Sequence, residues 1–154
     1  MEKIKVLFLC NHNSVRSQMA EGFLRHYYGD RYEAFSAGSN PTQVNPLAIK
    51  VMFEIGIDIS NQWSKSFQEF RDEKIDIVVN VCQSSAKESC VFCASPLIMG
   101  RPKVVTEVLP SVKKYINHPF TDPTTGQSGE VMMFRRLRDE ISKWIKDYFT
   151  NDYF

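Results

Sequence analysis

The sequence predicts a single α/β domain with three layers, in which helices cover both faces of a central parallel sheet of about four strands. The chain has 154 residues, of which 43% are hydrophobic and 24% are charged, and this length and composition suit one globular domain. Short apolar runs alternate with segments whose apolar residues recur at helical spacing. This alternation is typical of right-handed crossovers between parallel strands, an architecture that places functional sites at the carboxyl ends of the strands.

A strand and a helix are predicted at the start of the chain. Residues 4–9 form a nearly continuous apolar run, typical of a central strand, and the run ends at Cys10. From Ser17, a residue that suits a helix N-cap, apolar side chains recur every three or four residues as far as Gly29, where a helix would stop. The loop from Cys10 to Ser17 therefore joins the end of a strand to the start of a helix.

A second strand, a second helix and a third strand follow. Residues 35–38 close the second strand. An asparagine suited to an N-cap and a first-turn proline then introduce a helix over residues 47–55. The apolar run of residues 75–81 predicts the third strand, and like the first it ends at a cysteine, Cys82.

The second half of the chain gives weaker signals until its last helix. A glycine and several prolines interrupt the pattern between residues 83 and 113, so this stretch is expected to be mostly loop and mobile, with a weak fourth strand over residues 103–108. Further on, apolar side chains from Phe134 to Tyr148 lie on one stripe of a helix whose other face is basic. We interpret the stripe as core and the basic face as solvated surface.

The composition argues against several classes of function. Lys and Arg number 19 and Asp and Glu 18, and the resulting net charge of +1 is too small to indicate a nucleic-acid-binding protein. The longest apolar runs fall well short of the about 18 residues needed to cross a bilayer, and no signal peptide is visible, so we expect a cytoplasmic protein without a membrane partner. Four cysteines in a chain of this size indicate catalytic, redox or metal-binding thiols rather than a disulfide scaffold.

The loop after the first strand carries the strongest chemical signal. Five residues separate Cys10 from Arg16, and Ser17 follows at the start of the predicted helix. The backbone N–H groups of such a loop can surround a tetrahedral oxyanion, and the planar guanidinium of Arg16 would close the cradle. The same positive field, with a hydrogen bond from Ser17, favours the thiolate of Cys10 and makes it a nucleophile. The predicted oxyanion-binding residues are Asn11, His12, Asn13, Ser14, Val15 and Arg16.

Residues 10–22, Cys-Asn-His-Asn-Ser-Val-Arg-Ser-Gln-Met-Ala-Glu-Gly, resemble the low-molecular-weight protein tyrosine phosphatase family, and in particular its arsenate reductase branch. The likeness covers roughly residues 3–149. Its other segments are residues 36–38, 44–49, 54–60, 81–82 and 120–123. The resemblance implies the low-molecular-weight phosphatase fold in one domain of residues 1–154. It also implies an enzyme without an organic cofactor that reduces arsenate to arsenite and is recharged by thioredoxin.

An Asp-Pro pair, Asp122-Pro123, supplies a candidate acid. In the phosphatases that this chain resembles, the equivalent Asp protonates the leaving group, which implies that role for Asp122; with arsenate, a hydroxide would leave as water. Those phosphatases usually follow the pair with tyrosines that wall a pocket for an aromatic phosphoester. This chain has Thr124-Thr125-Gly126 instead, so the wall that binds a phenyl group is missing.

The remaining cysteines fit a reductase, which needs two electrons that one thiol cannot supply catalytically. The resemblance implies that Cys10 attacks arsenate, that Cys82 attacks the Cys10 sulfur and releases arsenite, and that Cys90 then attacks Cys82. Residues 83–89 are rich in small and polar residues, so they could be helical in the reduced protein and loop outward on oxidation, presenting the disulfide to thioredoxin. Seven residues rather than the usual six separate Cys82 from Cys90, and Val91 replaces a proline, so Cys93 is an alternative for the third role.

Three other interpretations stay open. The strongest of these is a protein tyrosine phosphatase that hydrolyses phosphate monoesters through a Cys10 phosphoenzyme, because the same loop and Asp122 would carry out that reaction. A zinc module is the second, since Cys90 and Cys93 have ligand spacing and Cys82 and His118 would complete the set. A protein that binds anions without catalysis is the weakest, because it needs no nucleophile.

No bound metal is predicted. Members of the arsenate reductase branch often hold a monovalent cation with an Asn, a Ser and acidic residues. Asn13, Glu21 and Ser36 are present here, but Lys65 stands where a second acid is expected. The expected partners are an arsenate-like or phosphate-like oxyanion and thioredoxin, and we expect a monomer that binds neither nucleic acid nor membrane.

Overall fold

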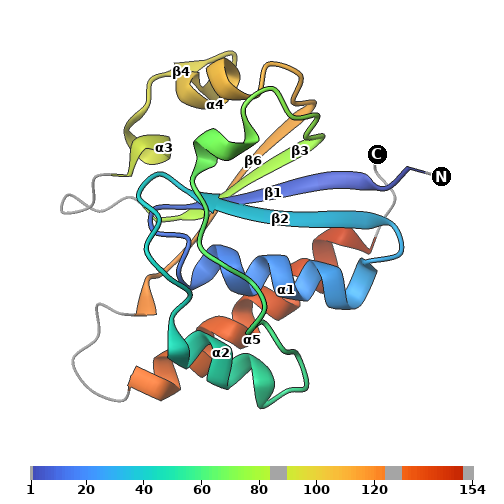
Figure 1. Cartoon of the computed structure of the whole chain (residues 1–154), viewed down its shortest axis with the longest axis vertical. Coiled ribbons are helices and arrows are strands. Elements are labelled where there is room, and N and C mark those ends of the chain that lie inside the picture. The colour runs from blue at the N-terminus through green and yellow to red at the C-terminus, as the bar shows by residue number, and fades with distance from the viewer. Residues whose placement is uncertain (1, 84–89, 124–129, 151–154) are drawn as a thin grey trace.

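The computed structural model describes residues 2–83, 90–123 and 130–150. It has a central sheet between two groups of helices (Figure 1). The sheet has four parallel strands in the order β2-β1-β3-β6. These strands are β1 (Ile4–Cys10), β2 (Tyr32–Gly38), β3 (Ile77–Cys82) and β6 (Lys114–Phe120). The predicted three-layer α/β/α architecture with a four-stranded parallel sheet is confirmed.

The longest helices lie together on one side of the sheet (Figure 1). They are α1 (Arg16–Tyr28), α5 (Glu130–Phe149) and the shorter α2 (Pro46–Phe53), which packs on α5. Shorter elements cover the other side. These are the 3-10 helix η1 (Phe67–Phe70), α3 (Val91–Ala94), α4 (Lys103–Val108) and a hairpin of β4 (Leu97–Ile98) and β5 (Arg101–Pro102).

The core follows the apolar patterns of the sequence. Residues 6–10 of β1 and all of β3 are buried, as expected of central strands that are covered on both faces. The stripe predicted for the last helix is its buried face. That face consists of Phe134, Leu137, Ile141, Ile145 and Phe149. Within the described ranges, the structure contains no helix with the length and apolar character to cross a membrane.

The first helix begins two residues earlier than predicted. Its first residue is Arg16 and its N-cap position is Val15, which makes no capping bond through its side chain. Ser17 lies inside the helix, fully buried, where its hydroxyl accepts a hydrogen bond from Asn13. The prediction of Ser17 as the N-cap was therefore wrong, because this hydroxyl is directed to the loop instead of to the first free N–H groups of the helix.

The prediction of a strand over residues 103–108 was also wrong. These residues form helix α4, which buries Val105 and Val108 on one face and leaves the polar side chains outside. The fourth strand is β6, which the sequence analysis missed. It is an edge strand with mostly half-buried residues and a proline, Pro119, so it lacks the continuous apolar run of a central strand.

The region 83–113 contains more regular structure than predicted. Its described part, residues 90–113, includes α3, the β4-β5 hairpin and α4, while residues 84–89 lie outside the described residues. The anchor of α3 is Phe92, which is buried and meets Phe67 edge-to-face with ring centroids 5.0 Å apart. Long-range aromatic packing of this kind leaves no periodic signal in so short a helix.

Gly38 ends β2 where this strand meets the loop after β1. A Cβ atom at this position would lie 2.7 Å from the carbonyl oxygen of Asn11 and 2.9 Å from the amide nitrogen of Asn13. Both atoms are backbone, so neither can turn aside as the end of a side chain could. The close approach of β2 to the loop therefore requires glycine.

We expect Gly38→Ala to lower the free energy of unfolding by about 1–3 kcal/mol, as overpacking does in a tightly packed region. Urea denaturation followed by circular dichroism measures this change. Glu33→Ala, at an exposed position of the same strand, is the matched control and should stay within about 0.5 kcal/mol of wild type. A Gly38→Ala protein as stable as the control would show that the loop does not pack against β2 as described.

Candidate active site

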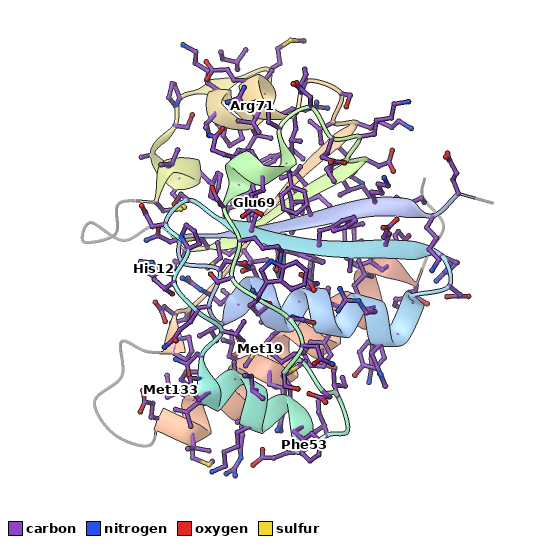
Figure 2. The ribbon with its side chains drawn as sticks, in the orientation of Figure 1. His12, Met19, Phe53, Glu69, Arg71 and Met133 are labelled. Carbon is purple, nitrogen blue, oxygen red and sulfur yellow. The ribbon has the colours of Figure 1, made fainter. Side chains whose placement is uncertain are left out.

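Two cysteines meet at the carboxyl edge of the sheet because adjacent strands end there. The register pairs Leu9 of β1 with Asn80 of β3, so Cys10 and Cys82, the last residues of these strands, lie at the same edge. Figure 2 shows His12, on the loop after β1, beyond the same ends of the strands. The sequence prediction that both cysteines share one site is consistent with this placement.

The loop after β1 is held by hydrogen bonds to its carbonyl oxygens. The carbonyl oxygens of Asn11, His12, Asn13 and Ser14 accept, in this order, from Asn40 N, Thr42 N, Gln18 Nε2 and Asn45 N, at 2.8, 3.2, 3.0 and 3.0 Å. In a trans peptide the C=O and N–H groups point in opposite directions. The amides of residues 12–15 therefore face away from these outer partners, toward the space that the loop encloses, as in an anion-binding nest.

Asn13 fixes the shape of this loop. Its backbone adopts a left-handed conformation with a φ of 49°, which Asn tolerates better than most residues. Its buried side chain donates from Nδ2 to Ser17 Oγ at 2.8 Å and accepts at Oδ1 from the amide of Lys65 at 2.9 Å. One amide side chain thus joins the loop to α1 and to the segment before η1.

The loop encloses a pocket of about 120 Å³. Its lining residues are Cys10, His12, Ser14, Val15, Arg16, Thr42 and Asp122. Since sites for drug-sized ligands measure roughly 300–1,000 Å³, this pocket suits a small ion. The structure thus brings Asp122, which is distant in sequence, to the predicted loop residues Cys10 and Arg16. It also adds Thr42, which the sequence analysis did not select.

Arg16 is anchored beside Asp122. Its Nη1 donates to the carbonyl oxygen of Phe120 at 3.2 Å, and its Nη2 lies 3.7 Å from Asp122 Oδ2. Arg16 is buried, whereas the side chain of Asp122 keeps 19% of its surface exposed. A buried guanidinium with a fixed orientation strengthens the attraction of the pocket for anions.

All four cysteines lie within the described residues, and none of them is in a disulfide. A hydrogen bond from Cys82 lowers the pKa of Cys10, and the Arg16 guanidinium and the amide of Asn11 lower it further, against the opposing effect of burial. Ser17 accepts from Asn13, and its expected bond to Cys10 stays a prediction. The site therefore makes the Cys10 thiol easier to ionise than an ordinary cysteine.

Cys82 has the opposite environment. Its hydrogen bonds to Cys10 and Cys90, together with burial, raise its pKa above the ordinary value of a thiol, although Arg16 acts in the other direction. The pKa of Cys90 falls to about 6, because Cys82 and the amides of Cys93 and Phe92 donate to its sulfur. A thiol has one hydrogen to donate, so at any moment Cys82 donates a hydrogen bond either to Cys10 or to Cys90.

The sulfurs of Cys82, Cys90 and Cys93 all lie within 4.8 Å of one another. Cys93 also donates to the carbonyl oxygen of Cys82 at 3.5 Å. His118, the fourth ligand in the zinc interpretation, does not join this group and stacks on Trp144 with ring centroids 4.5 Å apart. Among the described residues, the cysteines therefore form a set of three donors.

Asn80 is a functional candidate that the sequence analysis missed. It is buried in β3, where its Oδ1 accepts from the amide of Cys82 at 3.2 Å. Its Nδ2 lies 3.1 Å from Asn117 Oδ1 and 3.7 Å from the sulfur of Cys93. The available signal was a polar residue between the valines of the buried stretch 77–81.

The residues considered for a cation site meet around Glu21. Its carboxylate accepts from Ser36 Oγ at 2.7 Å and from Arg25 Nη2 at 2.7 Å, and it lies 3.6 Å from Lys65 Nζ. Burial lowers the pKa of Lys65, and Glu21 opposes this shift. Two protein cations therefore balance the charge of the buried carboxylate.

The segment Thr124-Thr125-Gly126, which stands where the phosphatases have tyrosines, lies outside the described residues.

Comparisons with known proteins agree with this site. The family described as low molecular weight phosphotyrosine protein phosphatase matches residues 5–151. An arsenate reductase of Halalkalibacterium halodurans is 38% identical over 151 residues, which are 96% of each chain. A solved arsenate reductase in its phosphate-binding state has a TM-score of 0.73 at 29% identity and covers 96% of this chain and 97% of that one.

A thioredoxin-dependent arsenate reductase of Corynebacterium glutamicum has a TM-score of 0.59 at 25% identity, covering 94% of this chain and 61% of that one. The matches together span almost the whole sequence, including the loop that lines the pocket and the strand ends that carry Cys10 and Cys82. The chain belongs to the low-molecular-weight phosphotyrosine protein phosphatase family, and within this family it is similar to arsenate reductases.

Proposed function

We propose that this protein is an arsenate reductase that uses Cys10, Cys82 and Cys90 as a relay recharged by thioredoxin. The observation that carries the proposal is the contact between the Cys10 thiol at the oxyanion pocket and the Cys82 thiol behind it. A phosphatase needs the first thiol only. A reductase needs a second thiol within reach of the first, because reduction of arsenate takes two electrons.

Arsenate binds in the first step to the loop amides and to Arg16. The Cys10 thiolate attacks the arsenic, and one arsenic–oxygen bond breaks. Asp122, which lines the pocket, gives a proton to the departing hydroxide so that it leaves as water. The products of this step are water and a Cys10 thiol–arsenate adduct in which arsenic is still pentavalent.

Reduction takes place in the second step. Formation of the adduct consumes the negative charge on Cys10 that raises the pKa of Cys82, while Arg16 continues to lower it. Cys82 therefore ionises more easily once the adduct has formed, and attacks the Cys10 sulfur. The electron pair of the sulfur–arsenic bond goes to arsenic, and arsenite leaves as a Cys10–Cys82 disulfide forms.

Cys90 attacks Cys82 in the third step and regenerates the Cys10 thiolate. Its distance of at most 4.8 Å from Cys82 supports this role, and the amides of Cys93 and Phe92 still lower its pKa when Cys82 is in the disulfide. Cys93 has the same proximity and is the alternative. Thioredoxin would then reduce the outer disulfide, as the name of the Corynebacterium glutamicum relative indicates for that protein. Hydrolysis of phosphate monoesters through Cys10 and Asp122 is the alternative function, and residual phosphatase activity is expected.

The proposed function predicts arsenite production from arsenate in the presence of thioredoxin, thioredoxin reductase and NADPH. Cys10→Ser should lower the rate by at least about 10³-fold, because the hydroxyl is a far weaker nucleophile at this site. NADPH oxidation measures turnover, and Lys50→Ala, an exposed position on α2, is the control. A Cys10→Ser protein that keeps wild-type activity, or a wild-type protein that forms no arsenite, would contradict the proposal.

Cys82 allows the two chemistries to be separated in one protein. We expect Cys82→Ser to lower multiple-turnover arsenate reduction by about 10²-fold or more, since no second thiol can attack Cys10. Hydrolysis of para-nitrophenyl phosphate should stay near the wild-type rate, because serine can still donate a hydrogen bond to Cys10.

Cys82→Ala removes that donor as well. The hydrogen bond lowers the pKa of Cys10, so its loss should move the acid limb of the hydrolysis profile to higher pH. Equal loss of both reactions in Cys82→Ser would mean that Cys82 supports the fold and not electron transfer.

A further inference from the structure

Cys93 enters the proposed relay only as the alternative to Cys90, yet it completes a compact cluster. Its sulfur and those of Cys82 and Cys90 lie within 4.8 Å of one another. Cys90 is the N-cap of α3 and Cys93 lies within its single turn, in which the amide of Ala94 donates to the carbonyl oxygen of Cys90 at 3.0 Å. Since Phe92 anchors this turn, the two sulfurs are held beside the end of β3 in the reduced protein.

We propose that Cys82, Cys90 and Cys93 together form a binding site for trivalent arsenic, through which the reduced protein captures arsenite. At a bond length of about 2.3 Å, as in zinc–sulfur bonds, and an angle of about 100° at a pyramidal centre, two bound sulfurs lie about 3.5 Å apart. Since the three sulfurs already lie within 4.8 Å of one another, changes of side-chain rotamer can bring them to that separation. The partly exposed Cys93 gives arsenite a route to the two buried thiols.

The binding reaction is a condensation without electron transfer. Arsenite, As(OH)₃, reacts with three thiols to give a trithioarsenite and three molecules of water. Three arsenic–oxygen and three sulfur–hydrogen bonds break, while three arsenic–sulfur and three oxygen–hydrogen bonds form. Arsenic stays trivalent throughout, so no oxidant or reductant is needed.

The number of donors favours trivalent arsenic over zinc. Arsenic(III) takes three sulfurs and keeps a lone pair, whereas structural zinc sites take four ligands. No fourth His, Cys, Asp or Glu from the described residues joins the group. The net charge of the complex also favours arsenic. A trithioarsenite is neutral, whereas a zinc trithiolate carries one negative charge, and the burial of Cys82 and Cys90 disfavours a charged complex.

The site has a consequence for catalysis that rests on the proposed function. Arsenite would be the product, and its capture would occupy two thiols of the relay, so the enzyme would be inhibited by its own product. Binding itself depends only on the three sulfurs and needs no turnover. The two proposals can therefore fail separately.

Titration of the reduced protein with sodium arsenite tests the site, with native mass spectrometry as the readout. We expect one arsenic atom per chain, with a mass gain of one arsenic less three hydrogens. Cys93→Ser should bind at least about 10²-fold more weakly, because the third bond of a chelate is lost. Cys10→Ser should bind like wild type, since Cys10 is outside the three-sulfur group.

Alkylation with iodoacetamide gives a second readout that requires no variant. Arsenite should protect Cys82, Cys90 and Cys93 and leave Cys10 reactive. The proposal is overturned if wild type binds no arsenic, if Cys93→Ser binds as tightly as wild type, or if Cys10 is protected in place of Cys93. It is also overturned if equimolar zinc chloride displaces the arsenic. Arsenite binding in a protein that cannot reduce arsenate would leave this inference intact and reject the proposed function.

Discussion

The contact between the thiols of Cys10 and Cys82 is the interaction on which the site depends. It exists because β1 and β3 are neighbours in a parallel sheet and end at the same edge, with Leu9 opposite Asn80. The apolar sequences that bury both strands thus determine where the two sulfurs meet. Their hydrogen bond lowers the pKa of Cys10 and raises the pKa of Cys82, so the two thiols differ in how easily they ionise. The packing that places β1 beside β3 therefore also brings together the two thiols whose contact shifts their pKa values.

Buried polar side chains maintain this arrangement at the edge of the sheet. Asn13 holds the anion-binding loop against α1, and Asn80 connects the backbone of Cys82 to the sulfur of Cys93. Both side chains have hydrogen-bond partners, so their burial does not carry the cost of unsatisfied groups. The loop carbonyls are likewise bonded outward, which leaves the loop amides directed to the pocket. The orientation of the loop amides is consequently set by the backbone geometry.

The sequence predicted the features that depend on local pattern. Continuous apolar runs identified the central strands, and the spacing from Cys10 to Arg16 identified the loop. Helix α4 and strand β6 were missed because each is half exposed and interrupted or flanked by proline, so neither has a distinct periodicity. Ser17 was misplaced because its hydroxyl bonds to a loop residue rather than to a helix end. The cluster that Cys93 forms with Cys82 and Cys90 could not be predicted from the sequence, since it depends on where α3 packs against the sheet.

The order of thiols in the relay is the central claim, and disulfide mapping after a single turnover tests it most directly. Reduced protein is treated with one equivalent of arsenate without thioredoxin, alkylated and digested, and the linked peptides are identified. The account predicts a Cys82–Cys90 disulfide with Cys10 alkylated in wild type, and a Cys10–Cys82 disulfide in Cys90→Ser. A Cys82–Cys93 link with Cys90 alkylated in wild type would give Cys93 the third role. Arsenite release with no disulfide to Cys82 in either protein would contradict the relay.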